Sequence, residues 1–118
     1  MNCEVLINQE IYDFLLTRAV TAKKRLWITT GVSTNFLVKL GEKYFRLAEL
    51  LLALNVNKDV RIISGINENK SSLIQKIIDK SPQMVKCCQK MHSKMIIVDN
   101  KYAYIGSGNL TAAGMGRP

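Results

Sequence analysis

Four polar side chains in the C-terminal third of the chain have the chemistry to hold a phosphate. His92 and Lys94 are two residues apart, and so are Ser107 and Asn109. Alternate residues of a β-strand share a face, so the imidazole is expected beside the ammonium, and the hydroxyl beside the amide. A neutral imidazole is a competent nucleophile, and the other three groups suit phosphate oxygens. We predict His92, Lys94 and Asn109 as catalytic residues, with Lys94, Ser107 and Asn109 binding the phosphate.

Asp99, Gly106 and Gly108 are predicted to support this site. Asp99 has the opposite strand parity from His92 and stands at a turn, which favours a structural hydrogen-bonding role over a catalytic one. The two glycines let the backbone approach a ligand closely. Each polar residue also has a plainer interpretation. A lone histidine is usually a satisfied surface or half-buried residue, and Lys94 alone would be a solvated surface lysine. Asn109 can simply cap the turn that follows it, and Ser107 can simply form a turn.

The span from His92 to Asn109 matches the pattern H-x-K-x4-D-x6-G-S-x-N at all six fixed positions. A chance match is on the order of one in a million, if each residue type is used about equally. The chain resembles single-motif members of the phospholipase D superfamily, of the bacterial endonuclease type. The resemblance covers most of the chain, because an early helix, a Trp-Ile strand, an Arg-Ile-Ile strand and a final hairpin occur in the family's order.

This resemblance implies a mechanism and a partner. In the family the motif histidine forms a covalent phosphohistidine, and a second motif's histidine protonates the leaving oxygen and then activates water. Because this chain has one histidine, the resemblance implies a homodimer with the active site at its twofold axis. His92 of one copy would be the nucleophile, and His92 of the other copy would be the acid and base. Lys94 and Asn109 would stabilise charge on the nonbridging oxygens. No metal or other cofactor is implied, and the sequence has no carboxylate cluster for one.

The sequence departs from the family pattern after the motif. Single-motif members usually continue through another strand, which carries an acid that orients the histidine. Here residues 111–118 contain no acid, and the sequence ends at Pro118. We therefore expect that residues 1–118 form a single domain that lacks its C-terminal strand, or that another group orients His92.

Strands and helices are expected to alternate along the chain. The strands are predicted over residues 4–7, 26–30, 60–64, 84–88, 92–98 and 102–106. Helices are predicted after a cap at Asn8, over 42–55 and over 71–80, and a turn over 99–101. This alternation implies crossover connections on a largely parallel sheet, to which the last hairpin adds antiparallel pairing. The predicted fold class is α/β, a mixed and largely parallel sheet with helices on both faces, like that of phospholipase D.

The net charge of +8 favours an anionic partner. Such a surplus attracts nucleic acid or anionic lipid surfaces, although a solvated basic face is the plainer interpretation. No amphipathic membrane-binding segment is evident, so we favour a nuclease over a phospholipase D-type hydrolase or transferase. A non-catalytic phosphate-binding module is the third alternative. Lys39, Lys43 and Arg46 either line the approach to the site or form an ordinary basic helix face.

Other features of the sequence exclude several classes of protein. The apolar run 47–54 is interrupted by Glu49 and is far too short to cross a membrane, so no transmembrane segment is expected. The N-terminus lacks the pattern of a secretory signal, which favours the cytoplasm. The three cysteines, an odd number, are expected to be reduced structural thiols. One histidine and no C-x-x-C pair argue against a zinc site.

Overall fold

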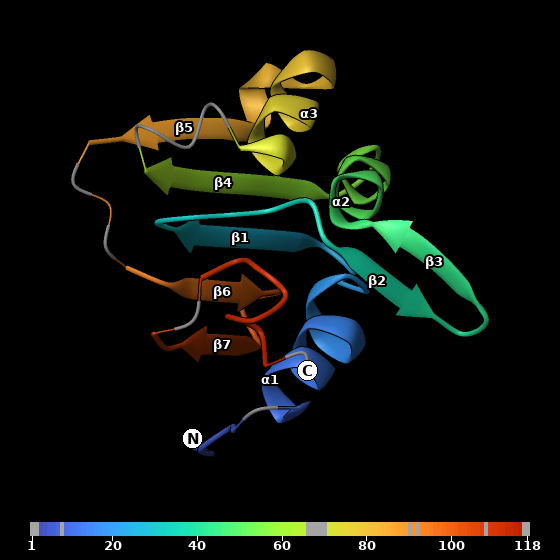
Figure 1. The fold of residues 1–118 in the computed structure, drawn as a ribbon, viewed down its shortest axis with the longest axis vertical. Helices are drawn as coiled ribbons and strands as arrows, with labels where there is room; N and C mark the ends of the chain where they lie inside the picture. Colours follow the sequence, from blue (N-terminus) through green and yellow to red (C-terminus); the bar gives the residue numbers. More distant parts are fainter. Residues whose placement is uncertain are drawn as a thin grey trace.

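A five-stranded sheet with the order β5-β4-β1-β6-β7 forms the centre of the molecule (Figure 1). The computed structural model describes residues 3–7, 9–65, 71–89, 91, 93–107 and 109–116. The strands of the sheet are β1 (Arg25–Thr30), β4 (Asp59–Gly65), β5 (Val85–Cys88), β6 (Met95–Val98) and β7 (Tyr102–Ile105). Neighbours β5, β4 and β1 are parallel, whereas β6 is antiparallel to both β1 and β7. The predicted mixed α/β sheet is confirmed.

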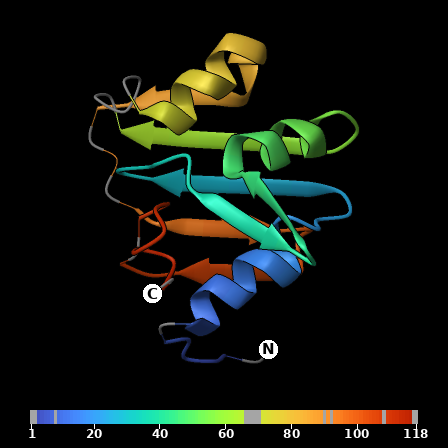
Figure 2. The ribbon, with the colours of Figure 1, turned by 45° about the vertical axis from the view of Figure 1, so that its right-hand side comes forward.

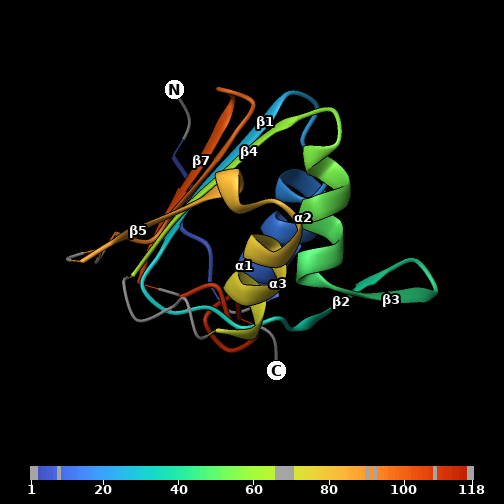
Figure 3. The same cartoon turned by 90° about the horizontal axis from the view of Figure 1, so that it is seen from above.

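The helices all cover one face of this sheet (Figures 2 and 3). They are α1 (Gln9–Phe14), which continues as a π-helix over Leu15–Ala19, α2 (Leu47–Asn55) and α3 (Ser72–Lys80). For the described residues, the expectation of helices on both faces was therefore wrong. The connections β1-α2-β4 and β4-α3-β5 step across the sheet in one direction. Since such crossovers are right-handed, successive steps in one direction put their helices on the same face.

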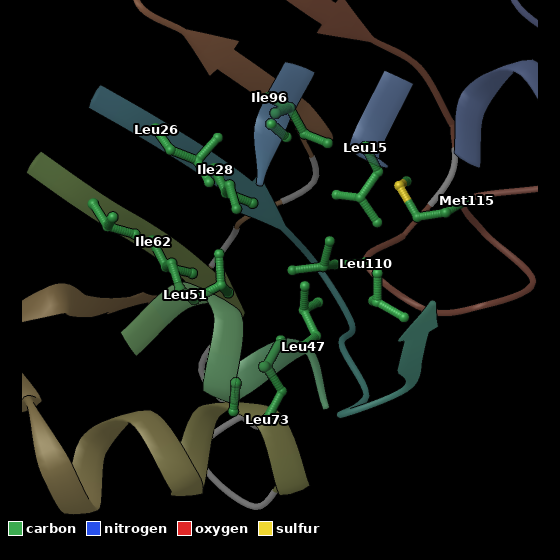
Figure 4. Close-up of a cluster of buried hydrophobic side chains, with 14 of the residues drawn as sticks. Leu15, Leu26, Ile28, Leu47, Leu51, Ile62, Leu73, Ile96, Leu110 and Met115 are labelled. Atoms are coloured by element: carbon green, nitrogen blue, oxygen red, sulfur yellow. The ribbon is translucent and has the colours of Figure 1, made fainter. Parts of the chain in front are cut away.

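An apolar core fills the space between the sheet and the helices (Figure 4). In β1, Leu26, Ile28 and Thr30 point into it, while the alternate residues are only half-buried on the open face. Leu110 and Met115, which follow the H-x-K motif, also lie in the core and are 2% and 1% exposed. Truncating a buried leucine to alanine typically costs about 2–5 kcal/mol. The segment after the motif is thus anchored by burial of apolar side chains.

A β-hairpin replaces the first part of the helix predicted over 42–55. It consists of β2 (Leu37–Leu40) and β3 (Lys43–Arg46), and α2 begins only at Leu47. The turn is made at Gly41, whose φ of 64° favours glycine. Val38 pairs with Phe45 across the hairpin and is fully buried, so strand alternation decides the conformation here. Lys39, Lys43 and Arg46 are exposed on the hairpin and form no helix face.

The remaining differences lie near the ends of predicted elements. Residues 4–7 form no strand, because an extended segment needs a neighbouring strand that a local pattern cannot supply. Strand β6 begins at Met95 and not at residue 92, and the predicted cap Asn8 lies outside the described residues. The third helix is confirmed, with the Ile74 N–H donating to the Ser71 hydroxyl at its N-cap (3.2 Å). Among the described residues, no helix has the length and apolar character needed to cross a membrane.

The carboxylate of Asp99 joins the β6–β7 turn to the start of β1. Its oxygens accept hydrogen bonds from the backbone N–H groups of Lys23 (2.9 Å), Lys24 (2.7 Å) and Arg25 (3.0 Å). Both Asp99 and Asn100 have a positive φ, 57° and 58°, which Asp and Asn tolerate better than most residues. The pKa of Asp99 is lowered, chiefly by the bond from Lys23, then by those from Arg25 and Lys24, while partial burial opposes the shift.

We predict that Asp99→Asn lowers the free energy of unfolding by about 1–2 kcal/mol at neutral pH. The amide keeps the size of the side chain and its tolerance of positive φ, but it has one acceptor oxygen and no charge. The folded pKa of Asp99 is below the unfolded value, about 3.9. Its stabilisation is therefore present above that value and is lost as the pH falls through the folded pKa. Urea unfolding should show a difference from wild type at neutral pH that closes in acid.

The matched control is Asp79→Asn, an exposed aspartate on α3 that accepts one bond from the Gln75 side chain (2.9 Å). This control should change stability by less than about 0.5 kcal/mol. A deficit of Asp99→Asn that persisted unchanged in acid would contradict a role for the carboxylate charge.

Candidate active site

The segments that carry the motif meet at one edge of the sheet. Parallel strands β1, β4 and β5 all end at this edge. Strand β6 runs the opposite way and begins there, and β7 ends there. The residues after Thr30, before Met95 and after Ile105 are therefore brought together, although they are far apart in the sequence. The carboxyl ends of parallel strands are where open α/β sheets bind ligands.

Lys94 stands immediately before β6 and is half-buried. Its carbonyl oxygen accepts a hydrogen bond from the Gly106 N–H (3.1 Å), which continues the pairing of the hairpin past the ends of its strands. The first half of the motif, around Lys94, and the second half, from Gly106 to Asn109, are thus hydrogen-bonded through their backbones. His92 and Gly108 lie outside the described residues, and the structure gives the geometry of the motif around them.

Asn109 is half-buried and is held against the end of β1. Its Oδ1 accepts a hydrogen bond from the Val32 N–H (3.2 Å), which leaves the Nδ2 group as the donor of this side chain. A Cβ placed on Gly31 would lie 3.4 Å from Asn109 Oδ1 and 3.7 Å from the Met91 carbonyl oxygen. Gly31 is therefore flanked by Met91, which precedes the first half of the motif, and by Asn109 from the second.

The other predicted site residues are placed differently. Ser107 is exposed at the same edge of the sheet. At Gly106 a Cβ would overlap the Tyr104 ring and hydroxyl, so a side chain there would require that ring to move. Asp99 lies at the far end of the β6–β7 hairpin, bound to backbone N–H groups and away from this edge. Among the described side chains, no group of three His, Cys, Asp or Glu residues could hold a metal ion.

Two threonines of β1 contact the motif, although the sequence did not single them out. The Thr29 hydroxyl donates to the Ser93 carbonyl (3.0 Å) and accepts from the Met95 N–H (3.0 Å). The Thr30 hydroxyl accepts from the Leu110 N–H (3.1 Å). Threonine is common in strands, since β-branched residues favour them. The only signal in the sequence was their position just before Gly31.

Comparison with known proteins identifies the family of the chain. Residues 15–117 match the family model described as cardiolipin synthase, PLD-like domain. The matched span contains the complete pattern from His92 to Asn109. No curated protein and no solved structure matches the chain significantly. Since the family model covers most of the sequence, the chain belongs to the phospholipase D superfamily.

Proposed function

We propose that this protein is a phosphodiesterase that acts through a covalent phosphohistidine on His92. Membership of the phospholipase D superfamily supports phosphodiester chemistry, by hydrolysis or transfer. The observation that carries the proposal is the meeting of the two halves of the motif at one sheet edge. There Lys94 and Gly106 are joined through their backbones, and Asn109 and Met91 flank Gly31.

The proposed reaction has two displacements at phosphorus. In the first, an imidazole nitrogen of His92 bonds to phosphorus, and the bond from phosphorus to the leaving oxygen breaks. That oxygen takes a proton from His92 of the second copy. In the second, the neutral imidazole of that copy removes a proton from water, whose oxygen attacks phosphorus and releases His92. Dividing one difficult displacement into two lowers each barrier.

Lys94 and Asn109 are proposed to stabilise the nonbridging oxygens in both displacements. Lys94 is a half-buried residue, and an ammonium on such a residue is a strong partner for phosphate as a charged donor. The amide of Asn109 is preorganised, since its Oδ1 is already held by Val32 and its Nδ2 is a donor. Ser107, which is exposed at the same edge, is proposed to contact the phosphate without taking part in bond making.

Nucleic acid is the proposed substrate. The surplus of 17 Lys and Arg over 9 Asp and Glu suits a polyanion whose phosphates repeat along a chain. The β2–β3 hairpin exposes Lys39, Lys43 and Arg46, which adds cations to the helix side of the molecule. A phospholipid is the second candidate, because the matching family model is described as that of cardiolipin synthase.

We predict that His92→Ala abolishes turnover and that Lys94→Ala lowers it by about 10²–10³-fold, the usual loss when one donor to a developing oxyanion is removed. Lys101→Ala, at the far turn of the same hairpin, is the matched control and should behave as wild type. Turnover should not change with EDTA. Labelled phosphodiester substrate should transfer its label to the wild-type protein and not to His92→Ala. Binding without any labelled intermediate would favour the phosphate-binding module, and EDTA inhibition reversed by a divalent metal would contradict the mechanism.

A further prediction concerns the homodimer. If each active site uses His92 from two copies, a mixed dimer of wild type and His92→Ala has no complete site. When wild type and His92→Ala are refolded together at constant total protein concentration, activity should fall with the square of the wild-type fraction, with dimers measured by sedimentation. A loss in direct proportion to that fraction, or an active monomer, would contradict a shared site at a twofold axis.

The last prediction for the proposed function concerns the substrate class. With the inactive His92→Ala protein, affinity for DNA should fall linearly on a log-log plot against salt, with a slope of about −0.9 for each duplex phosphate neutralised. Base sequence should matter little, because the site residues are directed at phosphate. Fluorescence anisotropy with single- and double-stranded DNA measures both effects. Vesicles containing an anionic phospholipid are the comparison. Absence of DNA binding at low salt, with turnover rising on vesicles, would favour the phospholipid.

A further inference from the structure

We infer that Thr29 and Thr30 are positioning residues that hold the two halves of the active site in register. The inference rests on the proposed function, since it assigns both residues to that site. As neighbours in a strand, they point to opposite faces of the sheet. Each nevertheless uses its hydroxyl to bind backbone groups of the motif segments, Thr29 on the side of Lys94 and Thr30 on the side of Asn109.

Thr29 holds the first half of the motif from the open face of the sheet. The antiparallel pairing of β1 with β6 ends at Thr29 and Met95. The Thr29 hydroxyl continues the contact between the two segments past the end of the strand pairing. It accepts a hydrogen bond from the Met95 N–H and donates one to the Ser93 carbonyl, each at 3.0 Å. These two backbone groups lie on either side of Lys94. One hydroxyl therefore sets the path of the chain through the residue that carries the ammonium.

Thr30 holds the second half from the core side, where it is 1% exposed. Its hydroxyl accepts from the Leu110 N–H (3.1 Å) and donates to the Val32 carbonyl (2.6 Å). The Val32 N–H in turn donates to Asn109 Oδ1 (3.2 Å). The same hydroxyl thus fixes the residue after Asn109 and the residue that orients the Asn109 amide.

The two halves are consequently held by adjacent residues, whose Cα atoms are about 3.8 Å apart. Small errors in such geometry are costly, since a displacement of about 1 Å can lower a rate by about 100-fold. Threonine is not needed here as a strand former, because valine serves equally well. Valine lacks the hydroxyl. At each of the two positions the threonine hydroxyl donates one hydrogen bond and accepts another.

Ser64 provides a matched comparison on the neighbouring strand. It pairs with Thr30 in the parallel register of β1 and β4 and is fully buried. Within the part of the chain that the structure describes, its hydroxyl has no hydrogen-bond partner. A buried hydroxyl at this end of the sheet therefore does not make motif contacts by proximity alone.

The test compares Thr29→Val, Thr30→Val, the serine variants of both residues and Ser64→Ala in the full chain. Turnover of bis(4-nitrophenyl) phosphate, binding of inorganic phosphate by NMR and thermal unfolding are measured for each. Thr29→Val should lower kcat by about 10- to 100-fold with little change in KM or unfolding temperature, since Thr29 is only half-buried. Thr30→Val should lower both kcat and stability, because it leaves buried backbone groups without a partner. Both serine variants should recover most of the activity, and Ser64→Ala should resemble wild type.

The outcomes separate this inference from the proposed function. Suppose that the wild type turns over substrate. If Thr29→Val is then unimpaired, or if Thr29→Ser is as impaired as Thr29→Val, the positioning role is overturned and the proposed function stands. Wild-type protein that binds phosphate without turnover would overturn the proposed reaction. In that case weaker phosphate binding by Thr29→Val, restored in Thr29→Ser, would still support positioning. Protein that neither binds phosphate nor turns over substrate would overturn both.

Discussion

Strand β1 and the residues on either side of it are hydrogen-bonded to the motif along its length. Before the strand, the N–H groups of Lys23 and Lys24 bind the Asp99 carboxylate. Within it, the backbone pairs with β6 and the Thr29 hydroxyl continues that pairing. After it, the Val32 N–H holds the Asn109 side chain. Because β1 is the central strand, with β4 on one side and β6 on the other, these contacts attach the motif to a backbone that is paired on both sides.

The two ends of the β6–β7 hairpin are stabilised by different physics. At the turn, a carboxylate neutralises three backbone N–H dipoles, so this end depends on charge and weakens in acid. At the other end, neutral hydroxyls and buried apolar side chains such as Leu110 and Met115 hold the chain, and these are insensitive to pH. The proposed site is thus supported by groups that do not change charge when His92, in the proposed reaction, gains and loses protons.

Much of the fold could be predicted from local patterns. Strands β1, β4, β5 and β7 and helix α3 lie within one or two residues of their predicted positions, because strand and helix periodicities differ and Ser71 is a clear cap. Where prediction failed, the deciding interactions were distant in sequence. The run 43–46 became a strand because it pairs with β2, and residues 4–7 found no partner among the described strands. The placement of α2 and α3 on one face follows from the order of the strands that they connect, which no local pattern contains.

The sequence by itself determined the chemistry of the candidate site. The types and spacing of His92, Lys94, Ser107 and Asn109 predict a nucleophile with donors for phosphate, and side-chain chemistry does not depend on the fold. Only the tertiary structure decided which groups hold that chemistry in place. Thr29 and Thr30 are more than 60 residues from their partners Ser93, Met95 and Leu110. No pattern in the sequence marks a hydroxyl that makes such a contact. Its partners are backbone groups, which nearly every residue carries and which only folding brings within reach.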